Sequence, residues 1–205
     1  AHYEIEPLSE YLAAQLSGRL CPGAVPYDMG YYREKLVSKC PLFTNEAEGL
    51  AKASAVFCGE ERTMPELLAY FESIGSGDAF RRMCVLDAII LNTDRHYGNF
   101  GVLFDTDTLE IQGMAPVFDH NRSLLPDLDN DQLANPAWYL RCCKPRLGQD
   151  FIRNAKGLLT DDIRRDLTEL RDFTFQQHPH ILAEQERVDA LCKIVQGRIH
   201  LILSE

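Results

Sequence analysis

The 205-residue chain is long enough for one sizeable domain or two small ones built around a buried core. Its 45% hydrophobic and 25% charged residues are typical of a globular protein, and no apolar run approaches the length of a membrane span. The formal net charge of −10 disfavours direct binding to nucleic acid or to an anionic membrane surface, although it does not disfavour a nucleotide held through a metal ion.

The seven cysteines form no C-x-x-C pair and no cysteine–histidine spacing typical of zinc. Reduced thiols in a cytoplasmic protein are therefore expected. The first six residues are charged and lack the apolar segment of a secretory signal. A chain without an initial Met can be a piece of a longer protein.

The first predicted element is a helix over residues 7–20, where leucines recur at every fourth position. Two strands are predicted next, over residues 24–32 and 35–43. Residues 46–57 have weak helical character.

Two further helices are predicted before the middle of the chain. Thr63 and Glu66 have the spacing of a capping box, so we expect a helix that runs to about residue 74. We expect Asp78 to cap the next helix, which continues to Leu91. The second half of that helix is almost wholly apolar, and this predicts the central buried helix of the fold.

A polar segment, residues 92–99, interrupts the apolar pattern directly after this helix. Residues 101–104 and 109–112 read as the strands of a hairpin, and an extended piece over 114–118 precedes Asp119.

The C-terminal part contributes two predicted helices, over residues 160–175 and 184–203, while 121–154 has weak periodicity. His178 in the connecting segment is expected to be solvated, and Trp138 to lie in the core. The order of elements predicts a mostly helical α+β protein rather than a doubly wound α/β fold.

Three side chains around the central hairpin carry the strongest chemical signal. Asp94 and Asn99 are five residues apart in the polar segment, and Asp119 comes twenty residues after Asn99. Mg²⁺ is usually held by one or two carboxylates plus substrate phosphates. In protein kinases an Asp precedes a metal-binding Asn by five residues, and a later Asp also binds the metal. The spacing therefore indicates phosphoryl transfer.

A purely structural role is the alternative for the polar segment. Asp94 could pair with Arg95 at the end of the helix, and Asn99 could simply form a turn. The functional interpretation is favoured because a hairpin and Asp119 follow at the required positions.

The sequence here resembles the HipA-like serine/threonine kinases of bacteria. The resemblance lies in residues 92–101, in 115–119 and in Ser123-Leu124. Weaker matches upstream, in residues 6–10, 25–27 and 37–43, look like the regulatory helix, inner strands and hinge of that family.

The resemblance implies a protein-kinase-like large lobe, residues 45–205, preceded by a remnant of the small lobe, residues 1–44. It implies that Asp94 is the catalytic base, that Asn99 and Asp119 bind Mg²⁺ and ATP, and that Arg95 and His96 organise the loop. It also implies a hinge that contacts the adenine of ATP through Ser38, Lys39 and Cys40. The expected partners are a protein substrate with a Ser or Thr and, by family resemblance, an antitoxin-like protein.

The chain departs from the kinase pattern in its first residues. A Gly-rich phosphate loop and an early Lys strand are absent, so the Lys that would pair with Glu6 or Glu10 would have to lie upstream. Two other functions stay open. A phosphoinositide-type lipid kinase is one, because such kinases also use D-R-H-x-x-N, and a non-catalytic pseudokinase is the other, because the phosphate loop is missing.

Overall fold

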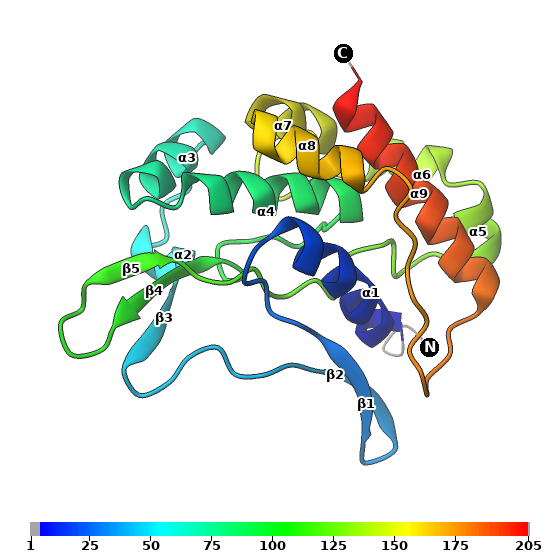
Figure 1. The fold of residues 1–205 in the computed structure, drawn as a ribbon, viewed down its shortest axis with the longest axis horizontal. Helices are drawn as coiled ribbons and strands as arrows, with labels where there is room; N and C mark the ends of the chain where they lie inside the picture. Colours follow the sequence, from blue (N-terminus) through cyan, green and yellow to red (C-terminus); the bar gives the residue numbers. More distant parts are fainter. Residues whose placement is uncertain (1–4, 205) are drawn as a thin grey trace.

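Helix α4 (Gly77–Ile90) is the central element of the computed structural model, which describes residues 5–204 (Figure 1). Its side chains from Met83 to Ile90 are buried, as the apolar pattern predicted. The molecule has more helix than strand, which confirms the prediction of a protein that mixes α and β elements.

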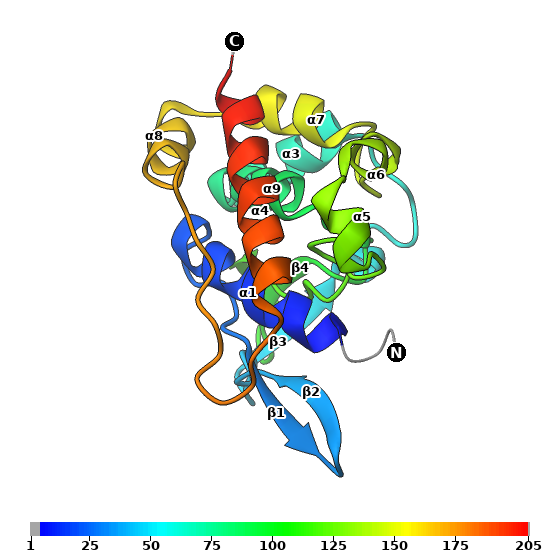
Figure 2. The same ribbon diagram turned by 90° about the vertical axis from the view of Figure 1, so that its right-hand side faces the viewer.

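The other helices surround α4 and close the core over it. Four of them contact it directly: α1 (Ile5–Leu20), α3 (Met64–Ser73), α7 (Phe151–Leu158) and α9 (Gln185–Leu203). Figure 2 shows α9 running across the front of α4, with α8 (Asp161–Glu169) on one side and the short helices α5 (Asn130–Ala134) and α6 (Ala137–Cys142) on the other.

The strands of the described residues form two small antiparallel sheets below the helices (Figure 1). Strands β1 (Asp28–Tyr32) and β2 (Lys35–Lys39) lie within the two strands predicted after the first helix, and they pair as an antiparallel hairpin. The other sheet contains β3 (Glu48–Lys52), β4 (Gly101–Asp105) and β5 (Ile111–Met114), with β4 in the middle. The second hairpin was predicted, but its partner β3 was not.

The prediction of weak helix over residues 46–57 is wrong for most of that segment. Residues 48–52 form β3, and only Ala53–Val56 are helical, as α2. Pairing with β4 decides the conformation, since Lys52 lies opposite Gly101 and the missing side chain there lets the backbone of Ala51 approach. This long-range pairing overrides a weak local propensity.

The helix starts agree in part with the sequence predictions. The Thr63 backbone N–H donates to Glu66 Oε2 at 2.7 Å, which confirms the capping box of α3. Helix α4 begins earlier than predicted, because Ser76 is its N-cap residue. Asp78 lies in the first turn instead, and its carboxylate pairs with Arg82 at 2.7 Å.

Three sequence predictions for the C-terminal part of the chain are wrong. The helix predicted over 160–175 ends at Glu169. His178 is buried rather than solvated: its ring packs edge-on against Tyr11, and its Nε2 lies 2.9 Å from Asp28 Oδ1. Trp138 is 60% exposed and stacks edge-on against Tyr139, so it does not anchor the core.

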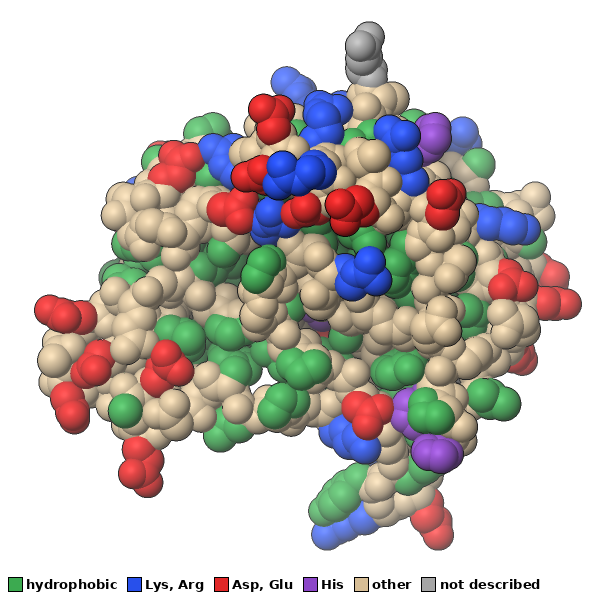
Figure 3. Space-filling view, viewed as in Figure 1, with side chains coloured by type: hydrophobic (Ala, Val, Ile, Leu, Met, Phe, Trp, Pro, Cys, Tyr) green, Lys and Arg blue, Asp and Glu red, His purple; other side chains and the backbone are tan. Residues whose placement is uncertain are grey.

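Acidic side chains gather over the part of the molecule where Figure 1 places β3, β4 and β5, whereas charges of both signs are mixed around α8 (Figure 3). Within residues 5–204, no helix combines the length and the apolar character needed to cross a bilayer.

Candidate active site

The polar loop after α4 starts with a sharp turn. Leu91 takes a left-handed conformation (φ 55°), and this turns the chain into the loop. The buried side chain of Asn92 then makes two bonds: its Oδ1 accepts from the Asp94 N–H at 3.0 Å, and its Nδ2 donates to the Asp119 carbonyl at 3.3 Å. Asn92 therefore joins the segments that carry the two predicted functional aspartates.

Arg95 is fully buried and organises the site. Its guanidinium forms a two-pronged ion pair with Asp87 of α4, with both N–O distances at 3.0 Å. Its Nη1 donates to the carbonyl of Asn99 at 2.7 Å and also to the carbonyl of Phe118. One nitrogen thus brings Asn99 next to the residue that precedes Asp119, which confirms the loop-organising role expected for Arg95.

Asp94 lies at the mouth of the loop with its carboxylate partly exposed. Its carbonyl accepts from the Asn99 Nδ2 at 3.1 Å and from the His96 N–H at 2.7 Å, so the loop closes on itself. Its Oδ1 pairs with Arg146 Nε at 2.9 Å. The alternative in which Asp94 pairs with Arg95 is therefore wrong.

The far end of the loop is held by helix α2. The first amides of α2 donate to it, from Ala53 to the Phe100 carbonyl at 2.8 Å and from Ser54 to the Tyr97 carbonyl at 2.9 Å. The loop is fixed at both ends, which is the rigidity that positioning a reacting group requires.

Asp119 is half-buried, and its backbone has a left-handed conformation (φ 59°). Its N–H donates to Tyr27 Oη at 3.1 Å. Burial raises the pKa of the Asp119 carboxyl, the Arg95 charge opposes that rise, and the charge of nearby Asp94 adds to it. A cation bound at this carboxylate would stabilise its charged form.

The chemistry of Asn99 and Asp119 fits Mg²⁺. The hydrogen bond from Asn99 to Asp94 uses the amide nitrogen, so the amide oxygen is the end that can ligate a cation. Among residues 5–204 there is no group of three or more His, Cys, Asp or Glu side chains that could hold a metal ion. Mg²⁺ does not require such a group, because waters and substrate phosphates complete its shell.

The first helix contributes a buried carboxylate beside Asp119. Glu10 Oε1 accepts the His120 N–H at 2.6 Å, and desolvation raises the pKa of Glu10 to about 7, with the charge of Asp119 adding to the rise. Glu6 instead pairs with Arg122 at 3.3 Å, toward the rim. Of the two glutamates considered for a lysine partner, Glu10 is therefore the one at the site.

His120 is held neutral between these groups. Its Nδ1 lies 3.2 Å from Arg95 Nη2, and it must accept because a guanidinium only donates. Burial and the neighbouring Arg95 charge keep the pKa of His120 well below its usual range.

The predicted hinge residues lie at the end of the β1–β2 hairpin. Ser38 and Lys39 belong to strand β2, and Lys39 pairs with Asp28 at 2.9 Å. Cys40 follows the strand and is exposed. Three residues further on, the ring of Phe43 lies 5.5 Å from the ring of Phe118, so the segment after β2 passes beside the residue that precedes Asp119.

Sequence reasoning assigned no role at the site to Asp87, Asn92, His120, Tyr27 or Arg146. Asn92 had a signal, as a polar residue at the end of an apolar helix. Tyr27 and Arg146 had none, because each lies more than fifty residues from the aspartate it contacts.

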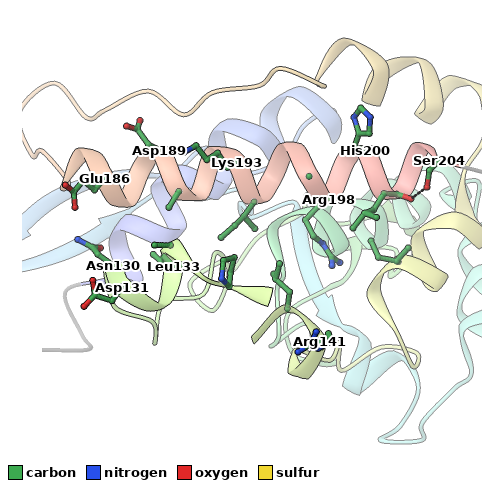
Figure 4. A pocket seen from close by; sticks show the side chains of 18 of the residues that line it. Asn130, Asp131, Leu133, Arg141, Glu186, Asp189, Lys193, Arg198, His200 and Ser204 are labelled. Atoms are coloured by element: carbon green, nitrogen blue, oxygen red, sulfur yellow. Dashed lines mark hydrogen bonds between the residues drawn. The ribbon is translucent and has the colours of Figure 1, made fainter. Parts of the chain in front are cut away.

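Two grooves of different character lie on the surface. One of about 830 Å³ adjoins the polar loop and is lined by His96, Tyr97 and Arg146. A larger one of about 1300 Å³ lies among α5, α6 and α9, with an apolar floor that includes Leu133 (Figure 4). None of the predicted site residues lines the larger groove.

Comparison with solved structures identifies the fold as kinase-like. The crystal structure of a Helicobacter pylori proinflammatory kinase, CtkA, superposes with a TM-score of 0.70, covering 97% of this chain and 86% of that chain at 18% sequence identity.

Sequence comparison leads to the same relative. The serine/threonine-protein kinase CtkA of Helicobacter pylori (strain J99) is 29% identical over 140 residues, which cover 60% of this chain. The matched region spans 42% of that kinase. No protein-family model matches the chain.

Proposed function

We propose that this chain forms the catalytic lobe of an ATP- and Mg²⁺-dependent protein serine/threonine kinase of the HipA-like kind. The observation that carries the proposal is the convergence on Arg95, whose guanidinium joins α4, Asn99 and the segment that ends in Asp119. The similarity to CtkA, a serine/threonine kinase by name, supports it.

Each site residue has a role in this proposal. Asp94 accepts a hydrogen bond from the Ser or Thr hydroxyl and orients it, while Asn99 and Asp119 hold Mg²⁺. When bound, MgATP supplies the phosphoryl group. The segment after β2, with Cys40, would lie against the adenine. Such a site acts mainly by positioning groups and neutralising charge.

Glu10 supports a kinase arrangement from the other side of the site. Kinases pair a helix glutamate with a lysine that contacts the phosphates. The raised pKa of Glu10, about 7, reflects a buried carboxylate that would gain from such a cation.

A non-catalytic pseudokinase is the second candidate, and one contact favours it. Arg146 occupies the Asp94 carboxylate at 2.9 Å, where an acceptor hydroxyl would have to bind. In a pseudokinase this ion pair would be permanent.

The first experiment measures nucleotide binding by calorimetry, with and without Mg²⁺. We expect Mg²⁺-dependent ATP binding that weakens at least tenfold in Asp119→Ala, because a metal ligand is lost. Asp127→Ala is the matched control, since this exposed carboxylate on the same segment pairs with Arg122 rather than with the site. Equal ATP affinity in Asp119→Ala and the wild type would contradict the assignment of the metal site.

A second measurement separates kinase from pseudokinase. In a kinase, Asp94→Ala keeps ATP affinity but slows phosphoryl transfer by about 10²–10⁴-fold, the usual contribution of an acid–base group. ATP binding with no transfer by the wild-type protein to any protein substrate would favour the pseudokinase.

A further inference from the structure

The 830 Å³ groove beside the polar loop differs in charge from the rest of the molecule. The chain carries a formal net charge of −10, yet three arginines line this groove: Arg62, Arg146 and Arg153. Glu61 is the acidic residue in the lining. Such a groove attracts an anionic ligand despite the acidic surface elsewhere.

Arg146 connects the groove to the reacting position. Its side chain is 58% exposed, and its Nε pairs with Asp94 Oδ1 at 2.9 Å. Exposed ion pairs contribute little to stability. An incoming carboxylate could therefore replace Asp94 on Arg146 at small cost, and this exchange would release Asp94 for a hydroxyl.

The other two arginines of the lining come from different parts of the chain. Arg62 precedes helix α3 and pairs with exposed Glu60 at 2.7 Å. Arg153 lies in the first turn of α7, where its backbone N–H is capped by Asp150 at 3.0 Å. No ion pair of the Arg153 side chain occurs among residues 5–204.

Apolar side chains line the groove as well, among them Met64, Leu68 and Leu147. A groove that combines apolar side chains with guanidinium groups suits an extended peptide, whose aliphatic stems pack on the apolar lining while its acidic ends reach the arginines.

We propose that this groove binds the segment of a protein substrate next to the acceptor Ser or Thr, and that it selects acidic side chains there. The inference rests on the proposed kinase function and names its substrate class. In this arrangement a carboxylate of the substrate replaces Asp94 as the ion-pair partner of Arg146. An acidic substrate therefore frees the Asp94 carboxylate, which then orients the hydroxyl of that substrate.

Peptide binding tests the groove independently of catalysis. Fluorescence anisotropy would compare two labelled peptides, each with one Ser, flanked on both sides by Glu in one and by Gln in the other. We expect the Glu peptide to bind about fivefold more tightly, since an exposed charge pair contributes up to about 1 kcal/mol. A third peptide with phosphoserine beside the acceptor shows whether the preferred anion is a carboxylate or a phosphate.

Arginine variants test whether the groove causes the preference for the Glu peptide. The triple variant Arg62→Gln/Arg146→Gln/Arg153→Gln should bind Glu and Gln peptides equally, because it removes all three guanidinium groups of the groove. Arg171→Gln, an exposed arginine outside the groove, should keep the wild-type preference. Circular dichroism would verify that the variants are folded.

The outcomes separate this inference from the kinase proposal. Equal binding of the Glu and Gln peptides by the wild type overturns the inference, and so does a preference that survives in the triple variant. Tighter binding of the Glu peptide that the triple variant loses supports it. Phosphoryl transfer from ATP to the Glu peptide, measured separately, reports on the kinase proposal alone.

Discussion

Arg95 shows how one buried charge can organise a site. Removing a guanidinium from water is costly, so it must be paired and hydrogen-bonded. Asp87 supplies the charge, and the carbonyls of Asn99 and Phe118 supply two further acceptors. Because these partners come from three segments, the same bonds that compensate the buried charge also set the relative positions of Asn99 and Asp119.

Glu10 predicts a specific pH dependence of stability. Its pKa is raised from the usual 4.5 to about 7, so the folded state binds its proton more tightly than the unfolded state does. The stabilisation is fully present below about pH 4.5 and is lost as the pH rises through about 7, an effect of roughly 3 kcal/mol. Gln cannot titrate, so the free energy of unfolding of wild type minus that of Glu10→Gln should fall as pH rises from 4.5 to 8.

Urea denaturation at a series of pH values measures this difference. Glu6→Gln is the control, since Glu6 is partly exposed and pairs with Arg122 at the rim of the site. A difference between wild type and Glu10→Gln that stays constant across this range would show that Glu10 does not titrate as its burial implies.

The sequence could predict those site residues that are local to one another. Asp94 and Asn99 share a loop, and a hairpin connects that loop to Asp119, so spacing alone indicated the group. Glu10 was one of two possible residues, and only its contact with His120 distinguishes it from Glu6. Arg146 could not be found, because its contact with Asp94 depends on how a weakly periodic segment folds over the loop.

Helices and strands also differ in whether they depend on local sequence or on contacts with distant segments. The central helix α4 and the capping box of α3 were predictable because their signals are continuous in sequence. Strand β3 was not, because its conformation depends on pairing with β4 about fifty residues later. The site depends on this pairing, since the following helix α2 holds the loop through the carbonyls of Tyr97 and Phe100.

Gly101 is the position at which the pairing of β3 and β4 can be tested. A Cβ at Gly101 would lie 2.1 Å from the Ala51 carbonyl oxygen and 2.9 Å from the Lys52 Cα, and a backbone cannot move aside easily. Gly101→Ala should therefore lower the free energy of unfolding by about 1–3 kcal/mol. Chemical denaturation measures the change.

Gly18 in helix α1 offers the matched control for this substitution. It is exposed, and no atom lies within 4 Å of the Cβ that alanine would add. Gly18→Ala should stabilise the protein by about 0.5–1 kcal/mol. If Gly101→Ala proved as mild as Gly18→Ala, the close approach of β3 would not constrain the fold.

At the scale of the whole molecule, one hydrophobic core joins both ends of the chain. Leu12 and Leu16 of α1 belong to the same buried cluster as Leu86 of α4 and Val195 and Ile199 of α9. The division into a small-lobe remnant, residues 1–44, and a large lobe, residues 45–205, stays a prediction. The core that α1 shares with the rest indicates one unit of folding.

We therefore expect α1 and α9 to unfold together in a single transition. Native-state hydrogen exchange measures the free energy of opening at each amide, and the most protected amides of α1 and α9 should agree within about 1 kcal/mol. Amides of the β1–β2 hairpin serve as an internal comparison, because its strands are more exposed. Clearly weaker protection of α1 would show that residues 1–44 open independently.

The buried pairing of Arg95 also has an evolutionary consequence. A descendant that lost catalysis would be free to replace Asp94, whose carboxylate is partly exposed and contacts one side chain, Arg146, among the residues described. It could not as easily replace Arg95 or Asp87, because a lone buried charge would remain. If the proposed kinase function is correct, we expect different selection on these adjacent residues: Arg95 would be kept wherever the architecture is kept, and Asp94 only where phosphoryl transfer is kept.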